Sequence, residues 1–274
     1  LALSYSIEGQ DLQLLKKGTA NAEKVTVSFW IKATKTGTNI LELYDNDNNR
    51  QISIAYTVSS SNTWEYKVVN FTADTTGVLG DDNGSSLAIN WWMGAGSNFS
   101  SGTLSTSWSS VTDADRAVGQ VNHADSTSNN FHITAVQLEV GTYTSSTIPP
   151  FQHESFGDNL ARCQRYCYNT NQNNTLYASL SVGAATSATG VYGQLYFPVT
   201  MRANPTGTVV QSTDYWALNA YAGGTDTFDN IAVQNCSTTQ GTIYCTGNVS
   251  QTAGSANRIR NNNTAARLLL VSEL

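Results

Sequence analysis

Charged residues and prolines are scarce in this sequence. Only 12% of the 274 residues are charged, against a usual share of roughly 25%, and only four are prolines. Serine, threonine, asparagine and glycine take their place, around β-branched and aromatic residues. This composition is typical of an all-β protein with many polar turns.

Basic residues are outnumbered, and long apolar runs are missing. The net charge is −6 and the isoelectric point is near 4.9, which argues against nucleic acid or an anionic membrane surface as a partner. No apolar run approaches the roughly 20 residues that span a bilayer, so membrane insertion is not expected. No secretory signal is recognisable. The first residue is Leu1 rather than methionine, so we expect the chain to be the end of a longer polypeptide.

Cysteine is rare, and its spacing does not fit zinc. The four cysteines fall as Cys163 with Cys167 and Cys236 with Cys245, whereas zinc needs closely spaced pairs plus further ligands. The first pair lies one helical turn apart, on a shared face. The second pair flanks a hairpin turn, so either a disulfide or buried free thiols would fit it.

The segment 45–49 begins like a calcium-binding loop, with an Asp-x-Asp-x-Asn start. The glycine expected at the sixth position is Arg50, and the glutamate expected at the twelfth is Tyr56. A hairpin turn of residues that tolerate positive φ explains the segment without a metal. We therefore predict no metal site and no cofactor.

Alternating apolar and polar residues predict strands along most of the chain. The clearest strand is Val25–Ala33, in which Val25, Val27, Phe29 and Ile31 share one face. In the first half, further strands are expected over residues 3–8, 40–44, 51–58, 64–73, 87–93 and 131–140. In the second half, they are expected over residues 176–182, 191–199, 208–211, 215–220, 230–234, 241–245 and 265–271.

The segment 131–168 joins two parts of the chain. A closing strand is followed by a linker with glycine and two prolines, and then by a short helix over residues 159–168 with Asp158 as its N-cap. The predicted fold class is all-β. We expect a jelly-roll β-sandwich over residues 1–145, a linker and short helix over 146–172, and a second, smaller β-sandwich over 173–274.

Two sets of segments resemble known families. Jelly-roll domains of carbohydrate-binding modules are similar, in order and spacing, to VTVSFWIKA, NTWEYKVVNFTAD and NFHITAVQLEVG. Bacteriophage tail fibre and tail-appendage proteins are similar to IPPFQHE followed by FGDNLARCQRYCY, with FPVTMR further on. The resemblance covers residues 1–170 well, residues 195–205 in part, and nothing across 206–260. It implies a virion protein, assembled in the host cytoplasm, that forms a homotrimer and contacts other virion tail proteins.

Two details qualify what this resemblance implies. Carbohydrate-binding relatives often hold a structural calcium through an aspartate in the last strand, and the matching positions here are Thr134 and Ala135. That calcium ligand is therefore missing. The apolar run LLLV at residues 268–271 needs cover, which either neighbouring copies of a trimer or its own sandwich would supply.

Aromatic residues are the candidates for a ligand site, since sugar rings stack on flat aromatic faces. Trp30 and Trp64 fall in strands and are expected to fill cores. Trp91 and Trp92 are adjacent on a strand, so one of them should point outward, and Trp92 is the candidate. The predicted ligand-facing patch of the second domain comprises Tyr215, Trp216, Tyr221, Asp226 and Asp229.

A polysaccharide-degrading enzyme is the main competing function, because some phage appendages cleave host glycans. Such chemistry needs two carboxylates roughly 5–9.5 Å apart. The candidate pairs lie in polar turns, where aspartate is common for backbone reasons, and they are Asp81/Asp82, Asp113/Asp115 and Asp226/Asp229. No nucleophile motif and no β-helix repeat is recognisable, so we predict that the chain is not an enzyme.

The sequence therefore predicts a tail fibre component that recognises host cell-surface polysaccharide. Several identical weak sites on one trimer would give avidity without tight single sites. The alternative is a purely structural appendage or connector whose jelly roll does not bind sugar.

Overall fold

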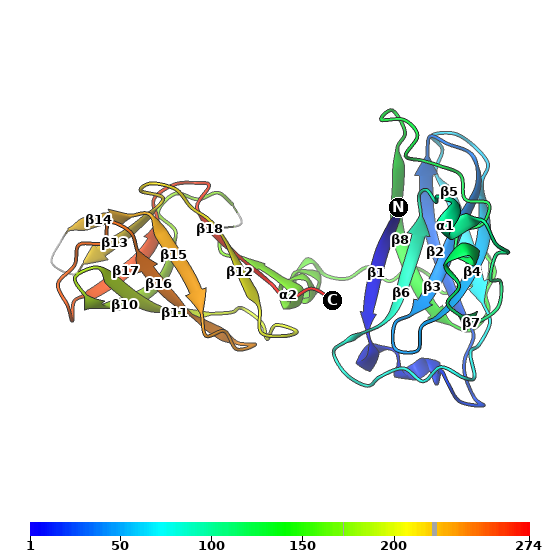
Figure 1. Ribbon diagram of the computed structural model, residues 1–274, viewed down its shortest axis with the longest axis horizontal. Helices are drawn as coiled ribbons and strands as arrows, with labels where there is room; N and C mark the ends of the chain where they lie inside the picture. Colours follow the sequence, from blue (N-terminus) through cyan, green and yellow to red (C-terminus); the bar gives the residue numbers. More distant parts are fainter. Residues whose placement is uncertain (172, 221–223) are drawn as a thin grey trace. The chain divides into compact units, whose positions relative to one another are not determined.

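A computed structural model describes residues 1–171, 173–220 and 224–274. The chain divides into two compact units, residues 1–152 and 153–273 (Figure 1). Each unit has its own hydrophobic core. Both units are built from antiparallel sheets, so the predicted all-β fold class is confirmed. None of the helices in the described residues is long and apolar enough to cross a bilayer.

The first unit is a jelly-roll-like sandwich of two sheets. The larger sheet has the strand order β1-β6-β3-β4-β7, and the smaller has the order β5-β2-β8. The strands are β1 Ala2–Glu8, β2 Val25–Ala33, β3 Gly37–Asp45, β4 Arg50–Val58, β5 Glu65–Phe71, β6 Ser85–Trp92, β7 Ser109–Ser110 and β8 Phe131–Val140. Short helical turns lie in the connections, at η1 Gly9–Asp11, η2 Gln13–Leu15, α1 Ser97–Ser100 and η3 Asp113–Asp115.

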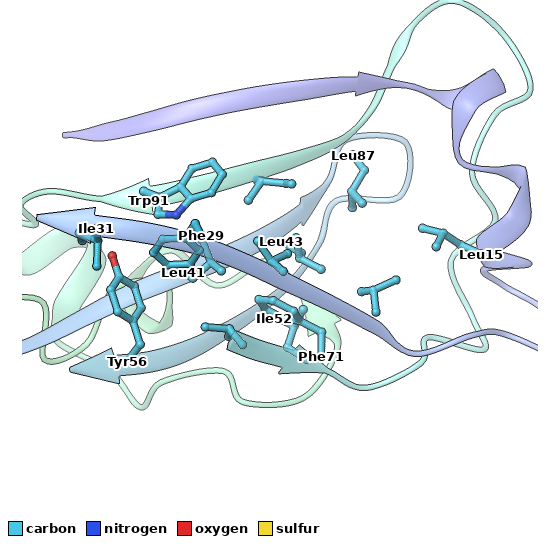
Figure 2. Packing of buried hydrophobic residues seen from close by; sticks show 14 of the residues in the cluster. Leu15, Phe29, Ile31, Leu41, Leu43, Ile52, Tyr56, Phe71, Leu87 and Trp91 are labelled. Atoms are coloured by element: carbon cyan, nitrogen blue, oxygen red, sulfur yellow. The ribbon is translucent and has the colours of Figure 1, made fainter. Parts of the chain in front are cut away.

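The core of the first unit lies between these two sheets (Figure 2). Val27, Phe29 and Ile31 of β2 are fully buried, as the alternation predicts. The Phe29 ring contacts the rings of Tyr56 and Trp91 edge-on, with centroids 5.3 and 5.7 Å apart. Such contacts add to the free energy of apolar burial, and they hold β2 against the larger sheet.

Residues 94–123 cover the outer face of the larger sheet with a second, smaller apolar cluster. Trp92 is buried in this cluster, whereas Trp91 is buried in the main core. The buried Glu42 carboxylate accepts hydrogen bonds from Trp92 Nε1 at 3.1 Å and from Arg116 Nε at 2.7 Å. Both indoles are therefore buried, because this sheet is covered on both faces.

A buried network of four charges lies at one end of the same sandwich. The Lys17 ammonium donates to the Asp45 carboxylate and lies 2.9 Å from Asp74 Oδ2. Arg50 holds Asp74 through two bonds of 2.7 and 2.9 Å. Burial alone would raise the pKa of Asp74, but the hydrogen bonds from Arg50 and Lys17 hold it well below its usual range. Two positive and two negative groups thus neutralise one another away from water.

The segment that begins like a calcium loop is the predicted hairpin turn. It connects β3 to β4, and Asn49 adopts a φ of 49° there. Asp45 Oδ1 accepts the N–H of Asn48 at 2.9 Å, and Asp47 Oδ2 accepts the N–H of Gly80 at 2.8 Å. Protein donors therefore bind the carboxylates of this turn.

The second unit packs a seven-stranded sheet and a three-stranded sheet around one core, as far as the described residues show. Their strand orders are β14-β13-β17-β10-β11-β16-β15 and β12-β18-β9. The elements are α2 Phe156–Tyr166, β9 Cys167–Asn169, β10 Ser179–Ser187, β11 Gly190–Tyr196, β12 Thr206–Val210, β13 Trp216–Ala220, β14 Thr225–Phe228, β15 Asn230–Gln234, β16 Gln240–Thr246, β17 Ala256–Asn261 and β18 Arg267–Val271.

Helix α2 begins three residues earlier than predicted. Its N-cap is Ser155 rather than Asp158, because Ser155 Oγ accepts the Asp158 N–H at 3.1 Å. The same hydroxyl donates to the Asp158 carboxylate at 2.6 Å, so the two side chains form a variant of the capping box. The helix ends at Tyr166, where the backbone becomes extended and enters β9.

The apolar run at residues 268–271 is covered within its own unit. Leu268 and Leu270 of β18 are fully buried in the core, and β18 pairs with β12 on one side and β9 on the other. Of the two ways to cover this run, the sandwich itself is the one observed. The run therefore gives no support to a trimer.

All four cysteines are free thiols. Cys245 lies in the core and pairs in register with Val191 and Ile231, and burial raises the pKa of its thiol to about 12. Cys236 lies in the loop before β16, and its Sγ is close to Gly241 at the start of that strand, whereas Cys245 lies near the end of the strand. The two sulfurs do not face each other across the hairpin, and buried free thiol is the correct reading of Cys245.

Candidate functional site

Of the residues predicted as a ligand-facing patch in the second unit, Trp216 is buried, and Asp226 and Asp229 bind other parts of the same unit. Trp216 is only 1% exposed and packs in the core from β13, so no ligand in solvent can stack on it. Tyr215 is half-buried against the same core. Tyr221 lies outside the described residues. The assignment of Trp216 to a surface patch was wrong, because the residue lies on the inward face of the strand predicted there.

The two aspartates of that patch hold turns. Asp226 belongs to β14, and its Oδ2 accepts the Ser250 N–H at 2.7 Å and Gln251 Nε2 at 3.0 Å. Asp229 Oδ1 accepts the Asp214 N–H at 2.9 Å. Both carboxylates therefore serve to hold nearby backbone in place, which accounts for their presence without a ligand.

Trp92, the candidate in the first unit, is also excluded as a ligand platform. Only 5% of it is exposed, and its indole N–H is engaged with Glu42. The prediction that one indole of the adjacent pair points to solvent assumed an uncovered outer face. Residues 94–123 cover that face instead.

The exposed indoles of the first unit include the two that the sequence assigned to cores. Trp30 is 41% exposed and Trp64 is 43% exposed. Trp30 lies on β2 between the buried Phe29 and Ile31, so alternation places it on the opposite face. Trp64 immediately precedes β5. Both indoles belong to the outer face of the three-stranded sheet.

Five side chains of this face form a cluster that we call the aromatic platform. It consists of two cross-strand rows, and its members are Trp30, Lys32, Trp64, Tyr66 and His132. In the first row, the rings of Trp30 and Tyr66 lie 5.4 Å apart with their planes 37° from parallel. In the second row, Trp64 lies 6.4 Å from the His132 ring, and Lys32 Nζ lies 5.9 Å from the Trp64 centroid. Rows two residues apart on a strand are separated by about 7 Å.

The platform is open because the chain covers only the other end of this face. Thr26 and Ser28 are fully buried there. Thr26 Oγ1 donates to the Gly141 carbonyl at 2.9 Å and accepts the Tyr143 N–H at 3.2 Å. The segment after β8 thus folds back over the part of β2 that holds Thr26 and Ser28, and it does not cover Trp30.

A β-bulge in β8 borders the platform. Thr134 pairs with Trp30 and Gln137 pairs with Ser28, so Ala135 and Val136 together face one residue of β2. Ala135 adopts a left-handed φ of 49°, which costs an L-residue roughly 1–2 kcal/mol. After the bulge, the residues that point outward are the odd-numbered ones instead of the even-numbered ones. The uninterrupted alternation predicted across residues 131–140 is therefore broken.

Replacing Ala135 with glycine is expected to raise the free energy of unfolding of residues 1–152 by about 1 kcal/mol, because glycine adopts positive φ without strain. Urea denaturation of the whole chain measures this change. The matched control is Ala55→Gly on β4, an exposed strand position of ordinary φ, which should lose about 0.5–1 kcal/mol. A loss of stability in both variants would contradict the strain at Ala135.

The platform supports binding rather than bond cleavage on the residues it brings together. It offers flat ring faces, one ammonium and one imidazole, but no carboxylate pair. Two of the aspartates considered for catalysis accept backbone N–H groups elsewhere, Asp82 from Gly84 at 2.8 Å and Asp115 from Thr103 at 2.7 Å. Within the described residues, no three His, Cys, Asp or Glu side chains gather as a metal site would require.

No family model matches the chain, and no curated protein matches it.

Proposed function

We propose that the aromatic platform binds host-surface glycans, and that the chain serves this purpose as part of a phage tail fibre. The observation that carries the proposal is the exposure of both Trp30 and Trp64 on the outer face of one sheet. Large apolar side chains left in solvent at one place on a surface mark an interaction site. The resemblance of flanking segments to tail fibre proteins and carbohydrate-binding modules agrees with a sugar as the ligand.

The position of the indoles suits sugar recognition. β2 is the central strand of its sheet, and the core contacts of Phe29 fix the backbone beside Trp30. Two rows about 7 Å apart present successive ring faces, so consecutive sugars of a chain have a stacking partner each. A site placed on strands loses little conformational entropy on binding.

A shallow platform of this size binds weakly by itself, and repetition would make it effective. A homotrimer, joined to other virion tail proteins, would present identical platforms to one polysaccharide and gain avidity. Light scattering of the purified chain measures the oligomeric state. A trimer is expected, and a monomer at high concentration would remove this part of the proposal.

Alanine at both Trp30 and Trp64 is expected to weaken glycan binding by about 30-fold or more, as truncation of central aromatic contacts does. Binding of the whole chain to an array of neutral and acidic oligosaccharides, followed by calorimetry on the hits, provides the measurement. Folding is checked by circular dichroism, since both side chains are exposed and their loss should leave the core intact.

The matched control is Tyr5→Ala, which removes an exposed aromatic residue from β1 of the other sheet. It should leave binding unchanged. An absence of any glycan ligand for the native chain would favour the purely structural appendage. Release of reducing ends from a bound polysaccharide would favour the polysaccharide-degrading enzyme.

A further inference from the structure

The platform carries positive charge in an acidic protein. The whole chain has a net charge of −6. The outward positions of the two platform rows nevertheless hold no aspartate or glutamate, and they are Trp30, Tyr66 and Thr134 in one row and Lys32, Trp64 and His132 in the other. The local charge is thus opposite in sign to that of the molecule.

Lys32 differs from most lysines of its unit in lacking a carboxylate. Four others bind one, and these are Lys16, Lys17, Lys35 and Lys67. In the described part of the chain, Lys32 forms no ion pair, and its Nζ is held instead near the face of Trp64. A lysine whose stem lies along the sheet, with its ammonium near a ring, leaves its donors available to an anion.

The carboxylate that the strand register brings next to Lys32, that of Glu65, does not neutralise it. Glu65 pairs in register with Ile31, whose side chain is buried, so Glu65 belongs to the opposite face of the sheet. Its oxygens accept the N–H groups of Ser59 and Ser60 and the Lys67 ammonium. The positive charge of Lys32 is therefore left for a ligand.

We infer that the ligand of the platform is an acidic saccharide, one whose ring carries a carboxylate, phosphate or sulfate group. This inference rests on the proposed function and names the class of sugar. A ring stacked on Trp64 brings its substituents toward Lys32 Nζ, with the exposed His132 ring next in the same row. An ammonium suits all three anions, because it acts as a point charge with three donors.

The test compares each acidic oligosaccharide that binds with its uncharged counterpart, in which the carboxyl is reduced or the ester group removed. The whole chain is used at physiological salt. The acidic form is expected to bind about tenfold more tightly, and Lys32→Gln should abolish that preference. Lys24→Gln is the matched control, since Lys24 is exposed and forms no ion pair in the described part of the chain.

The outcomes separate this inference from the proposed function. If neutral glycans bind as tightly as acidic ones, and binding still needs Trp30, the inference fails and the function stands. If Lys32→Gln binds acidic and neutral forms like the native chain, the inference also fails. Failure of the native chain to bind any glycan would overturn both. Loss of charge preference in Lys32→Gln with retained neutral binding supports the inference directly.

Discussion

Replacing Asp74 with alanine is expected to lower the free energy of unfolding of residues 1–152 by about 3–5 kcal/mol. Its carboxylate lies between Arg50 and Lys17, and the side chains of Lys17 and Asp74 are almost completely buried. Removing one member leaves a positive charge in a low-dielectric interior without its partner. The cost of removing that charge from water is then no longer offset by its attraction to the Asp74 carboxylate.

The same residue makes the unit sensitive to acid. The pKa of Asp74 is lower in the folded protein than in the unfolded chain, where an aspartate titrates near 3.9. Its contribution to stability is therefore fully present above about pH 5 and is lost as the pH falls below about 4. The stability difference between the native chain and Asp74→Ala should accordingly shrink with acidification.

Urea denaturation at pH 7 and at pH 3 measures both effects. The matched control is Glu23→Ala, which breaks an exposed pair with Lys16 in the same unit and should cost no more than about 1 kcal/mol. Equal losses for Asp74→Ala and Glu23→Ala would show that the buried network does not stabilise the fold. A loss for Asp74→Ala that is independent of pH would contradict the ionised state of its carboxylate.

Replacing Trp216 with alanine is expected to lower the free energy of unfolding of residues 153–273 by about 3–5 kcal/mol. The indole is fully buried from β13, at the centre of a cluster that includes Leu218 and Phe228. Its Nε1 has no hydrogen-bond partner in the described part of the chain, so Trp216→Phe forfeits volume but no hydrogen bond. We expect the phenylalanine variant to lose less than the alanine variant.

Thermal and urea unfolding, followed for each unit by hydrogen exchange, measures the effect. Only the transition of the second unit should move, because Trp216 belongs to the core of that unit alone. Tyr196→Ala is the control, since this exposed tyrosine of β11 lies outside the core and should cost little. Unchanged stability of Trp216→Ala together with lost glycan binding would restore its assignment to a ligand-facing patch.

Local periodicity was sufficient for much of the fold. The alternation of Val25–Ala33 predicted the bounds of β2 and its buried residues, and the strands around it follow the same rule. Periodicity did not predict β17, the strand Ala256–Asn261 in the interior of the seven-stranded sheet. Asn257 and Asn261 are buried there beside Ile259 on the inward face, so no apolar alternation marks this strand.

The candidate site was the part that sequence could not place. Alternation separates the two faces of a strand, and it put Trp30 opposite Phe29, but it does not say which outward faces stay open. Residues 94–123 bury Trp92, whereas the segment after β8 stops short of Trp30. Strand spacing is a property of the local backbone, so the sequence by itself determined the all-β class and the inward face of β2. Cover over a face depends on distant segments returning to it, so only the tertiary structure decided that Trp30 and Trp64, and not Trp92 and Trp216, meet the solvent.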